Sequence, residues 1–184
     1  MNKIVIVAVA MGMLTSTTVL AQEGSMPTTQ GLLENICIGS RLDEKLLEPF
    51  VQQTATFFKA KSMKIEPEML PSVNPDATSG WVIGKGDRSF IVAFAKKVVE
   101  GTPSISCSVA TQADDNAVAA LRRYIETTYN TRKIADQKQG GTTVAVYRAE
   151  LLGFSSPKKF SVQQVHAGAG LDGMVMVSFF DSSP

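Results

Sequence analysis

The chain contains two cysteines, Cys37 and Cys107, and a bond between them would constrain the fold more than any other feature of the sequence. Residues 104–109 alternate strictly, so in a β-strand Cys107 faces inward with Ile105 and Val109 while the serines face outward. A disulfide from this strand to Cys37 would fix the N-terminal region onto the sheet. Neither cysteine belongs to a C-x-x-C motif or has a histidine near it in the sequence, which favours a structural bond over a catalytic thiol.

The N-terminus has the pattern of a secretory signal peptide. Lys3 supplies a positive charge, residues 4–14 are continuously apolar, and residues 15–21 end in Val-Leu-Ala. The apolar run is interrupted by four hydroxyl side chains and is shorter than the roughly 20 residues that a membrane span needs. We therefore expect cleavage near Ala21 and a periplasmic or secreted protein with no transmembrane anchor. An oxidising compartment in turn favours a Cys37–Cys107 disulfide.

Charge and length then limit the classes of protein that the chain can belong to. Lys3 is the only charged residue in the first 21, so cleavage leaves 163 residues with 17 basic and 17 acidic side chains. A neutral chain does not supply the basic field typical of nucleic-acid binding. One histidine and two cysteines are too few for most metal sites built from protein ligands. We divide the chain into a signal peptide at 1–21, a mobile leader at 22–30 and a single domain at 31–184.

Hydrophobic periodicity predicts two main helices and six strands. The helical segments are a turn at 41–47, a helix at 49–61 with Pro49 in its first turn, and a helix that Asp114 or Asp115 caps and that ends near 129. The strand segments are 81–84, 89–98, 104–110, 142–151, 159–166 and 174–180, whereas 62–79 and 130–141 are predicted to be connections. Because most turns are short, we expect an α+β fold of order α-βββ-α-βββ. It has an antiparallel sheet of about five or six strands, both helices on one face and one disulfide.

Two features that could indicate catalysis or a cofactor have simpler interpretations. Residues 168–173 match G-x-G-x-x-G, but a strand pattern follows where a phosphate site needs a helix, so we predict a glycine-rich hairpin loop. His166 is the only imidazole, and we interpret it as a side chain at a strand end. A Ser-His-Asp site assembled in space stays open as an alternative. We therefore predict no catalytic, cofactor-binding or metal-binding residues, and the disulfide cysteines are the only site residues.

The layout of signal peptide, two cysteines, helices and strands resembles that of small two-cysteine periplasmic proteins of uncharacterised function from Gram-negative bacteria. The resemblance covers most of the chain that follows residue 21. It implies an exported α+β domain with a disulfide, and it transfers no active-site residue.

These observations favour a periplasmic, non-enzymatic protein that binds or supports another macromolecule. The concrete hypothesis is an accessory part of an envelope or secretion assembly, with a protein partner in the cell envelope. One alternative is an inhibitor or immunity protein that blocks an enzyme through an exposed loop, at 63–75 or 168–173. A second alternative is a small hydrolase or ligand-binding module with an apolar pocket under the sheet. The sequence leaves the partner, the ligand and the oligomeric state open.

Overall fold

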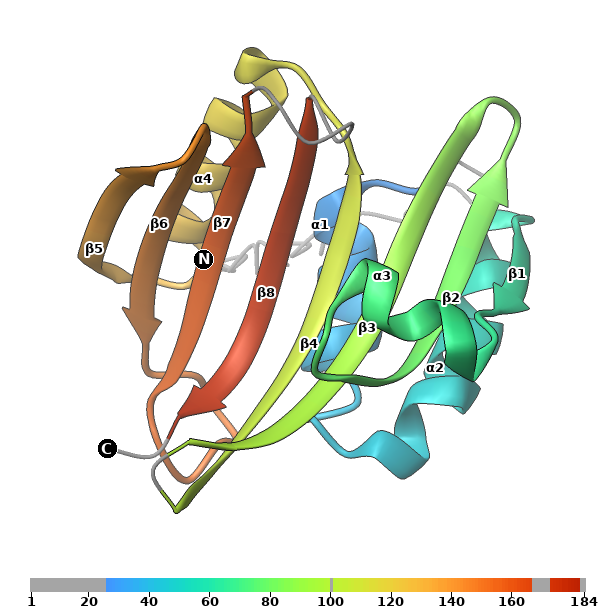
Figure 1. The fold of residues 1–184 in the computed structure, drawn as a ribbon, viewed down its shortest axis with the longest axis horizontal. Helices are drawn as coiled ribbons and strands as arrows, with labels where there is room; N and C mark the ends of the chain where they lie inside the picture. The colour runs from blue at the N-terminus through green and yellow to red at the C-terminus, as the bar shows by residue number, and fades with distance from the viewer. Residues whose placement is uncertain (1–25, 100, 167–172, 183–184) are drawn as a thin grey trace, which may run out of the picture.

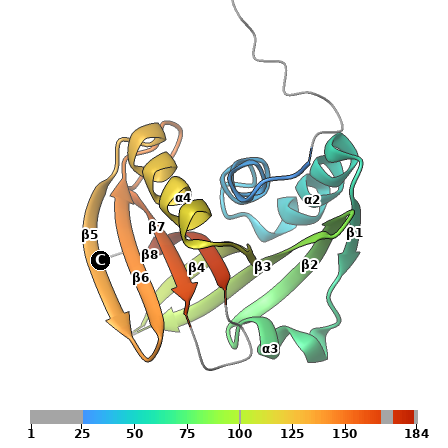
Figure 2. The same ribbon diagram turned by 90° about the horizontal axis from the view of Figure 1, so that it is seen from above.

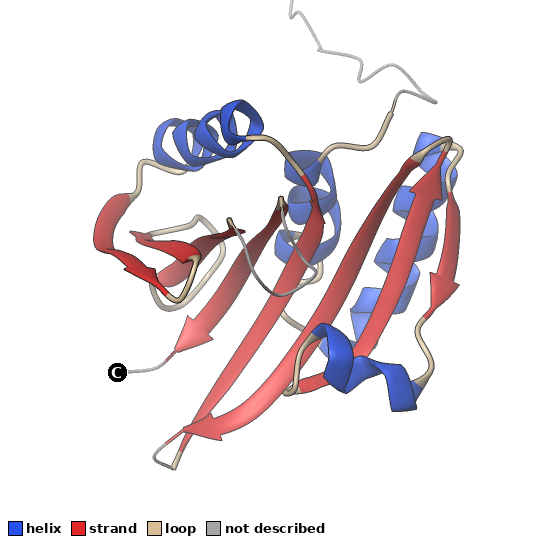
Figure 3. Ribbon diagram, turned by 45° about the horizontal axis from the view of Figure 1, so that its top comes forward, coloured by secondary structure: helices blue, strands red, loops and turns tan. Residues whose placement is uncertain are grey.

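Eight antiparallel strands form one sheet in the computed structural model, which describes residues 26–99, 101–166 and 173–182. The strand order across the sheet is β1-β2-β3-β4-β8-β7-β6-β5 (Figures 1 and 3). The strands are β1 (Lys61–Lys64), β2 (Ala77–Lys85), β3 (Arg88–Val99), β4 (Thr102–Gln112), β5 (Arg132–Gln139), β6 (Thr142–Ala149), β7 (Lys158–Val165) and β8 (Met174–Ser182). The pairing of β4 with β8 joins the first half of the chain to the second.

The main helices cover one face of this sheet, as Figure 2 shows. On that face lie a helical segment made of α1 (Thr29–Leu32) and the π-helical turn η1 (Leu33–Ile38), together with α2 (Glu44–Phe58) and α4 (Asp115–Thr128). The short η2 (Pro67–Met69) and α3 (Leu70–Val73) connect β1 to β2, and α3 lies against the opposite face. The predicted α+β class and the placement of two main helices on one face are therefore confirmed.

The predicted number of strands is wrong, because each half of the chain contributes one strand more than expected. All six predicted strand segments form strands, and the two missed strands, β1 and β5, are the two edges of the sheet. Both are rich in lysine and other polar residues, which is typical of edge strands but weakens the apolar alternation that a sequence pattern needs. Their extended conformation comes from pairing with β2 and β6.

The predicted disulfide is present and links the helical layer to the middle of the sheet. Cys37 on η1 and Cys107 on β4 are bonded with their Cα atoms 5.3 Å apart, and both are fully buried. Leu32, Leu33 and Ile36 of the same helical segment are also fully buried, so the bond lies within the main hydrophobic core. Residues 31–39 therefore pack on the core, as their apolar content predicts.

The alternation around Cys107 places its neighbours as expected, with one difference. Val109 is fully buried and Ile105 is partly buried against the core. Ser108 lies on the opposite face, yet it is also buried, and its hydroxyl is 2.8 Å from the hydroxyl of Ser178 on β8. An outward position in the middle of this sheet is therefore not necessarily an exposed one.

The first long helix begins earlier than predicted and contains Pro49 in its interior. The Asp43 side chain caps α2 by accepting from the backbone N–H of Lys45 at 3.0 Å. The helix therefore starts at Glu44, and one element includes most of the predicted turn and of the predicted helix. Pro49 is the sixth residue of α2, and its side chain is exposed. Capping and the burial of Val51 and Phe58 outweigh the backbone hydrogen bond that proline cannot donate.

The second long helix agrees with its prediction at both ends. The Asp114 side chain accepts from the backbone N–H of Ala117 at 2.7 Å, and α4 ends at Thr128. Val118, Leu121 and Ile125 face the core. Ala117, by contrast, is exposed.

The signal peptide at 1–21 lies outside the described residues, as does most of the loop at 168–173. The helix α1 starts at Thr29, inside the stretch that we interpreted as a leader. Within the described ranges, no helix has the length and apolar character needed to cross a membrane.

Candidate functional site

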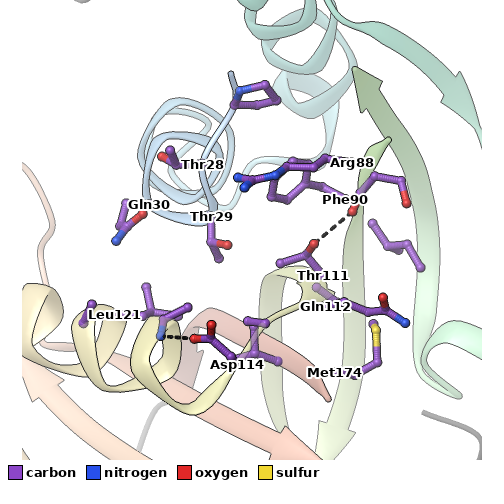
Figure 4. Close-up of a pocket in the computed structure, with 18 of the residues that line it drawn as sticks. Thr28, Thr29, Gln30, Arg88, Phe90, Thr111, Gln112, Asp114, Leu121 and Met174 are labelled. Atoms are coloured by element: carbon purple, nitrogen blue, oxygen red, sulfur yellow. Dashed lines mark hydrogen bonds between the residues drawn. The ribbon is translucent and has the colours of Figure 1, made fainter. Parts of the chain in front are cut away.

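Two clefts flank the start of the first helical segment. The α1–α4 cleft, of about 800 Å³, lies between the starts of α1 and α4 and the adjoining ends of β3, β4 and β8 (Figure 4). The α1–α2 groove, of about 730 Å³, lies between that segment and α2. Thr28 and Gln30 line both. Volumes of this size suit small organic ligands, so both clefts are candidate sites.

The α1–α4 cleft has an apolar floor that the core holds in place. Phe90 of β3, Leu121 of α4 and Val175 of β8 line the cleft and are almost completely buried. Because these three side chains belong to the main hydrophobic cluster, their positions are fixed before any ligand enters. The floor can therefore bury an apolar group without reorganising.

Arg88 is the one basic residue in the lining of this cleft within the described ranges. It follows the tight turn between β2 and β3, in which Lys85 pairs with Arg88 and Gly86 adopts a φ of 63° that glycine tolerates easily. Figure 4 shows Arg88 reaching towards α1 across the mouth of the cleft. In the described part of the chain its guanidinium has no ion pair. A guanidinium in this position can bind a carboxylate through two parallel hydrogen bonds.

The other polar groups around the cleft have structural roles or lie at its rim. The Asp114 carboxylate is used in capping α4, and the Thr111 hydroxyl donates to the backbone carbonyl of Ser89 at 2.9 Å. Asp87 lies in the turn before Arg88 and also lines the cleft. Its negative charge competes with any anionic ligand for the guanidinium.

The α1–α2 groove has a different chemical character. Four aromatic side chains line it: Phe50, Phe57 and Phe58 from α2, and Tyr124 from α4. Of the described residues in its lining, Glu34 alone is charged, and the remaining polar groups are hydroxyls and side-chain amides. The groove therefore combines aromatic rings with a single negative charge.

Two tyrosine hydroxyls hold the Glu34 carboxylate. The hydroxyls of Tyr124 and Tyr129 both donate to Glu34 Oε1, the latter at 2.9 Å. The Tyr129 ring stacks on Phe160 with centroids 4.9 Å apart, which ties the cluster to the core. Burial raises the pKa of each tyrosine, and the nearby Glu34 charge raises it further. Both phenols are therefore neutral donors at physiological pH.

His166 belongs to neither cleft. It directly follows β7, its side chain is exposed, and its Nε2 is 2.8 Å from the Thr143 hydroxyl. Its backbone N–H donates to the carbonyl of Gly141 at 2.8 Å, which holds it beside the β5–β6 turn. The Ser156 hydroxyl accepts from Lys158 Nζ at 2.8 Å.

The other residues that could indicate a site either have structural partners or lack neighbours suited to catalysis or metal binding. In the described ranges, no group of three His, Cys, Asp or Glu side chains could hold a metal ion. Lys158 is almost fully buried and pairs with Asp181 at 2.7 Å. Met174 lines the α1–α4 cleft, whereas Met63 and Met69 are exposed.

Sequence reasoning did not identify the residues that define these clefts. Arg88 falls between the predicted strand segments 81–84 and 89–98, and Glu34 is the single charge within residues 31–39, most of which are apolar. An isolated charge in a segment that must pack on the core is a signal for Glu34. The position of Arg88 relative to α1 depends on the packing of distant elements and has no local signal.

Comparisons with known proteins add no assignment: no protein-family model, curated protein or solved structure matches the chain.

Proposed function

We propose that this chain is an exported, non-enzymatic binding protein whose α1–α4 cleft takes a ligand with a carboxylate and an apolar body. The observation that carries the proposal is Arg88 at the mouth of a cleft with a floor of Phe90, Leu121 and Val175. The guanidinium binds the carboxylate, and the floor removes the apolar body from water. The Thr29 hydroxyl, at the start of α1, supplies a neutral hydrogen-bonding group to the same cleft.

Two sources can supply this chemistry: a small free acid, or the C-terminal end of a partner protein with an apolar last residue. The second source agrees with the hypothesis of a protein partner in the cell envelope and an accessory role in an envelope or secretion assembly. Both sources present the same pair of groups to the cleft, so matched probes are needed to separate them.

We further propose a periplasmic or secreted location. The signal pattern at 1–21 supports it, and so does the Cys37–Cys107 disulfide, because such bonds persist mainly in oxidising compartments. The resemblance to small two-cysteine periplasmic proteins supports the same location.

The binding proposal predicts that acids bind more tightly than their amides. We would titrate isotope-labelled protein with octanoate and octanamide, and with N-acetyl-leucine and its amide, and follow backbone NMR shifts around the cleft. We expect saturable binding of the acids and affinities about tenfold lower for the amides, since each amide lacks the charge that Arg88 recognises. Preference for N-acetyl-leucine over octanoate would indicate a chain end, and the reverse preference a free acid.

The matched variants are Arg88→Gln and Arg123→Gln. Both remove one positive charge from an exposed side chain, but Arg123 lies on α4 outside the cleft lining. Only Arg88→Gln should reduce acid binding, by about tenfold, while leaving the amides unchanged. Equal binding of acids and amides, or no binding of any probe at millimolar concentration, would refute the proposal.

A further inference from the structure

The α1–α2 groove combines the two features that recognise organic cations. Its aromatic lining offers ring faces that attract positive charge, and Glu34 supplies a formal negative charge beside them. Among the residues that the structure describes, no lysine, arginine or histidine lines the groove, so no described side chain in its lining repels a cation. The α1–α4 cleft differs, because its lining combines one basic residue, Arg88, with the carboxylates of Asp87 and Asp114.

The rings that form the groove are held in place by packing. Phe58 is buried in the core, and its ring meets that of Phe57 edge to face at a centroid distance of 5.1 Å. Phe50 and Phe57 are only partly buried, so each keeps surface available to a ligand. On the other side, Tyr124 contacts Tyr129 edge to face at 5.9 Å. The aromatic wall therefore exists before a ligand binds, which lowers the entropy cost of binding.

Glu34 keeps binding capacity after its contacts to the tyrosines. Both hydroxyls donate to Oε1, and among the described residues no donor is bonded to Oε2. The side chain is exposed, so ligands can reach it. Since the raised tyrosine pKa values keep both phenols protonated, the only charge in this cluster at neutral pH is that of the carboxylate.

We propose that the α1–α2 groove binds an organic cation, such as a quaternary ammonium or an alkylated amine, between its aromatic rings and Glu34. The alkyl groups of such a cation contact the rings of Phe57 and Tyr124, while the charge is balanced by the carboxylate. The side-chain amide of Gln53 and the hydroxyl of Thr54 can bond to polar substituents of the same molecule. This site is separate from the carboxylate site proposed above and does not depend on it.

The test compares choline with its uncharged carbon isostere, in which a tert-butyl group replaces the trimethylammonium group. The two probes have nearly the same shape, so a difference in affinity reports the charge. We expect NMR shifts of α1, η1 and α2 to saturate with choline, and about tenfold weaker binding of the isostere.

Three variants connect that difference to the groove. Glu34→Gln keeps an oxygen acceptor for the tyrosine hydroxyls but removes the charge, and it should weaken choline binding about tenfold without affecting the isostere. Phe57→Leu should weaken choline binding about threefold to tenfold, because an aliphatic side chain lacks the ring quadrupole. Glu68→Gln, in the exposed η2 segment outside the groove, is the control and should bind choline like the wild type.

Two outcomes would overturn the proposal. One is equal affinity for choline and its isostere, including the absence of binding by both. The other is unchanged choline binding by Glu34→Gln, in which case Glu34 serves only to tie η1 to α4 through the tyrosines. Thermal unfolding of each variant, recorded in parallel, separates loss of the cation site from loss of the fold.

Discussion

At the scale of single residues, Tyr147 shows that the core can contain a polar group at a cost in folding free energy. It is fully buried on β6, and its hydroxyl has no hydrogen-bond partner among the described residues. Burial raises the pKa of Tyr147 to about 12, and the negative charge of Glu126 on α4 adds to the effect. A raised pKa means that the folded state favours the protonated phenol. This contribution to stability is therefore present below the ordinary pKa near 10 and is lost as the pH rises through 12.

We predict that Tyr147→Phe changes the free energy of unfolding at neutral pH by less than about 1 kcal/mol, because the lost hydroxyl makes no bond in the described structure. The variant should lose less stability than the wild type between about pH 10 and pH 12. Urea unfolding across that pH range measures both effects. Tyr124 and Tyr129 also have raised pKa values, so some alkaline loss should persist in the variant. A full wild-type pH dependence in Tyr147→Phe would contradict the prediction.

At the scale of elements, local signals located the interior strands and the second long helix, but not the start of the first long helix or the edges of the sheet. The Asp114 cap lies where the sequence predicts a helix start, whereas the Asp43 cap precedes the predicted start of the first long helix. The turn with Gly86 joins two of the predicted strand segments. The edge strands β1 and β5 have few apolar residues to bury, so their conformation depends on the neighbouring strand. The start of α2 raises a separate difficulty. Because proline is well accepted in the first turn of a helix, the sequence did not show that Pro49 lies in the interior of α2 until the structure placed the cap at Asp43.

Pro49 inside α2 leads to a prediction about helix stability. Proline cannot donate the backbone hydrogen bond to the carbonyl of Lys45, one turn earlier, and its ring crowds that carbonyl. Its side chain is exposed, so replacement does not disturb the core. We predict that Pro49→Ala stabilises the protein by about 2 kcal/mol, after allowing for the greater freedom of the unfolded chain.

Thermal or urea unfolding would measure this change, with Lys45→Ala as the control. Lys45 is another exposed residue of α2, and its replacement alters helix propensity by only a few tenths of a kcal/mol. A destabilised Pro49→Ala variant would show that the helix depends on the geometry that proline imposes.

At the scale of the whole molecule, the sheet is continuous only because β8 returns to pair with β4. The helical segment 29–38 lies on the same face as α2 and α4, and the disulfide anchors it to β4. Both clefts border this segment, so the position of one short helix decides where Arg88 and Glu34 can meet a ligand.

We predict that loss of the disulfide destabilises the whole fold. The bond closes a loop across a sequence separation of 70, for which the chain-entropy model gives about 4 kcal/mol. Urea unfolding with and without reductant should therefore show a lower midpoint for the reduced protein. The double variant Cys37→Ser, Cys107→Ser should unfold at a similarly low midpoint. Identical midpoints for oxidised and reduced protein would refute this prediction.

The sequence by itself determined the α+β class, six of the strands, both long helices and the bond between Cys37 and Cys107. Periodicity and capping residues act locally, so they can be recognised in the sequence. Two cysteines allow only one intramolecular disulfide. Only the tertiary structure decided the edge strands, the interior position of Pro49 and the two clefts. An edge strand needs a neighbour to supply its hydrogen bonds, and a cleft is the space left between elements far apart in the chain. The chemistry of Arg88 and Glu34 therefore became visible only once the helices were placed on the sheet.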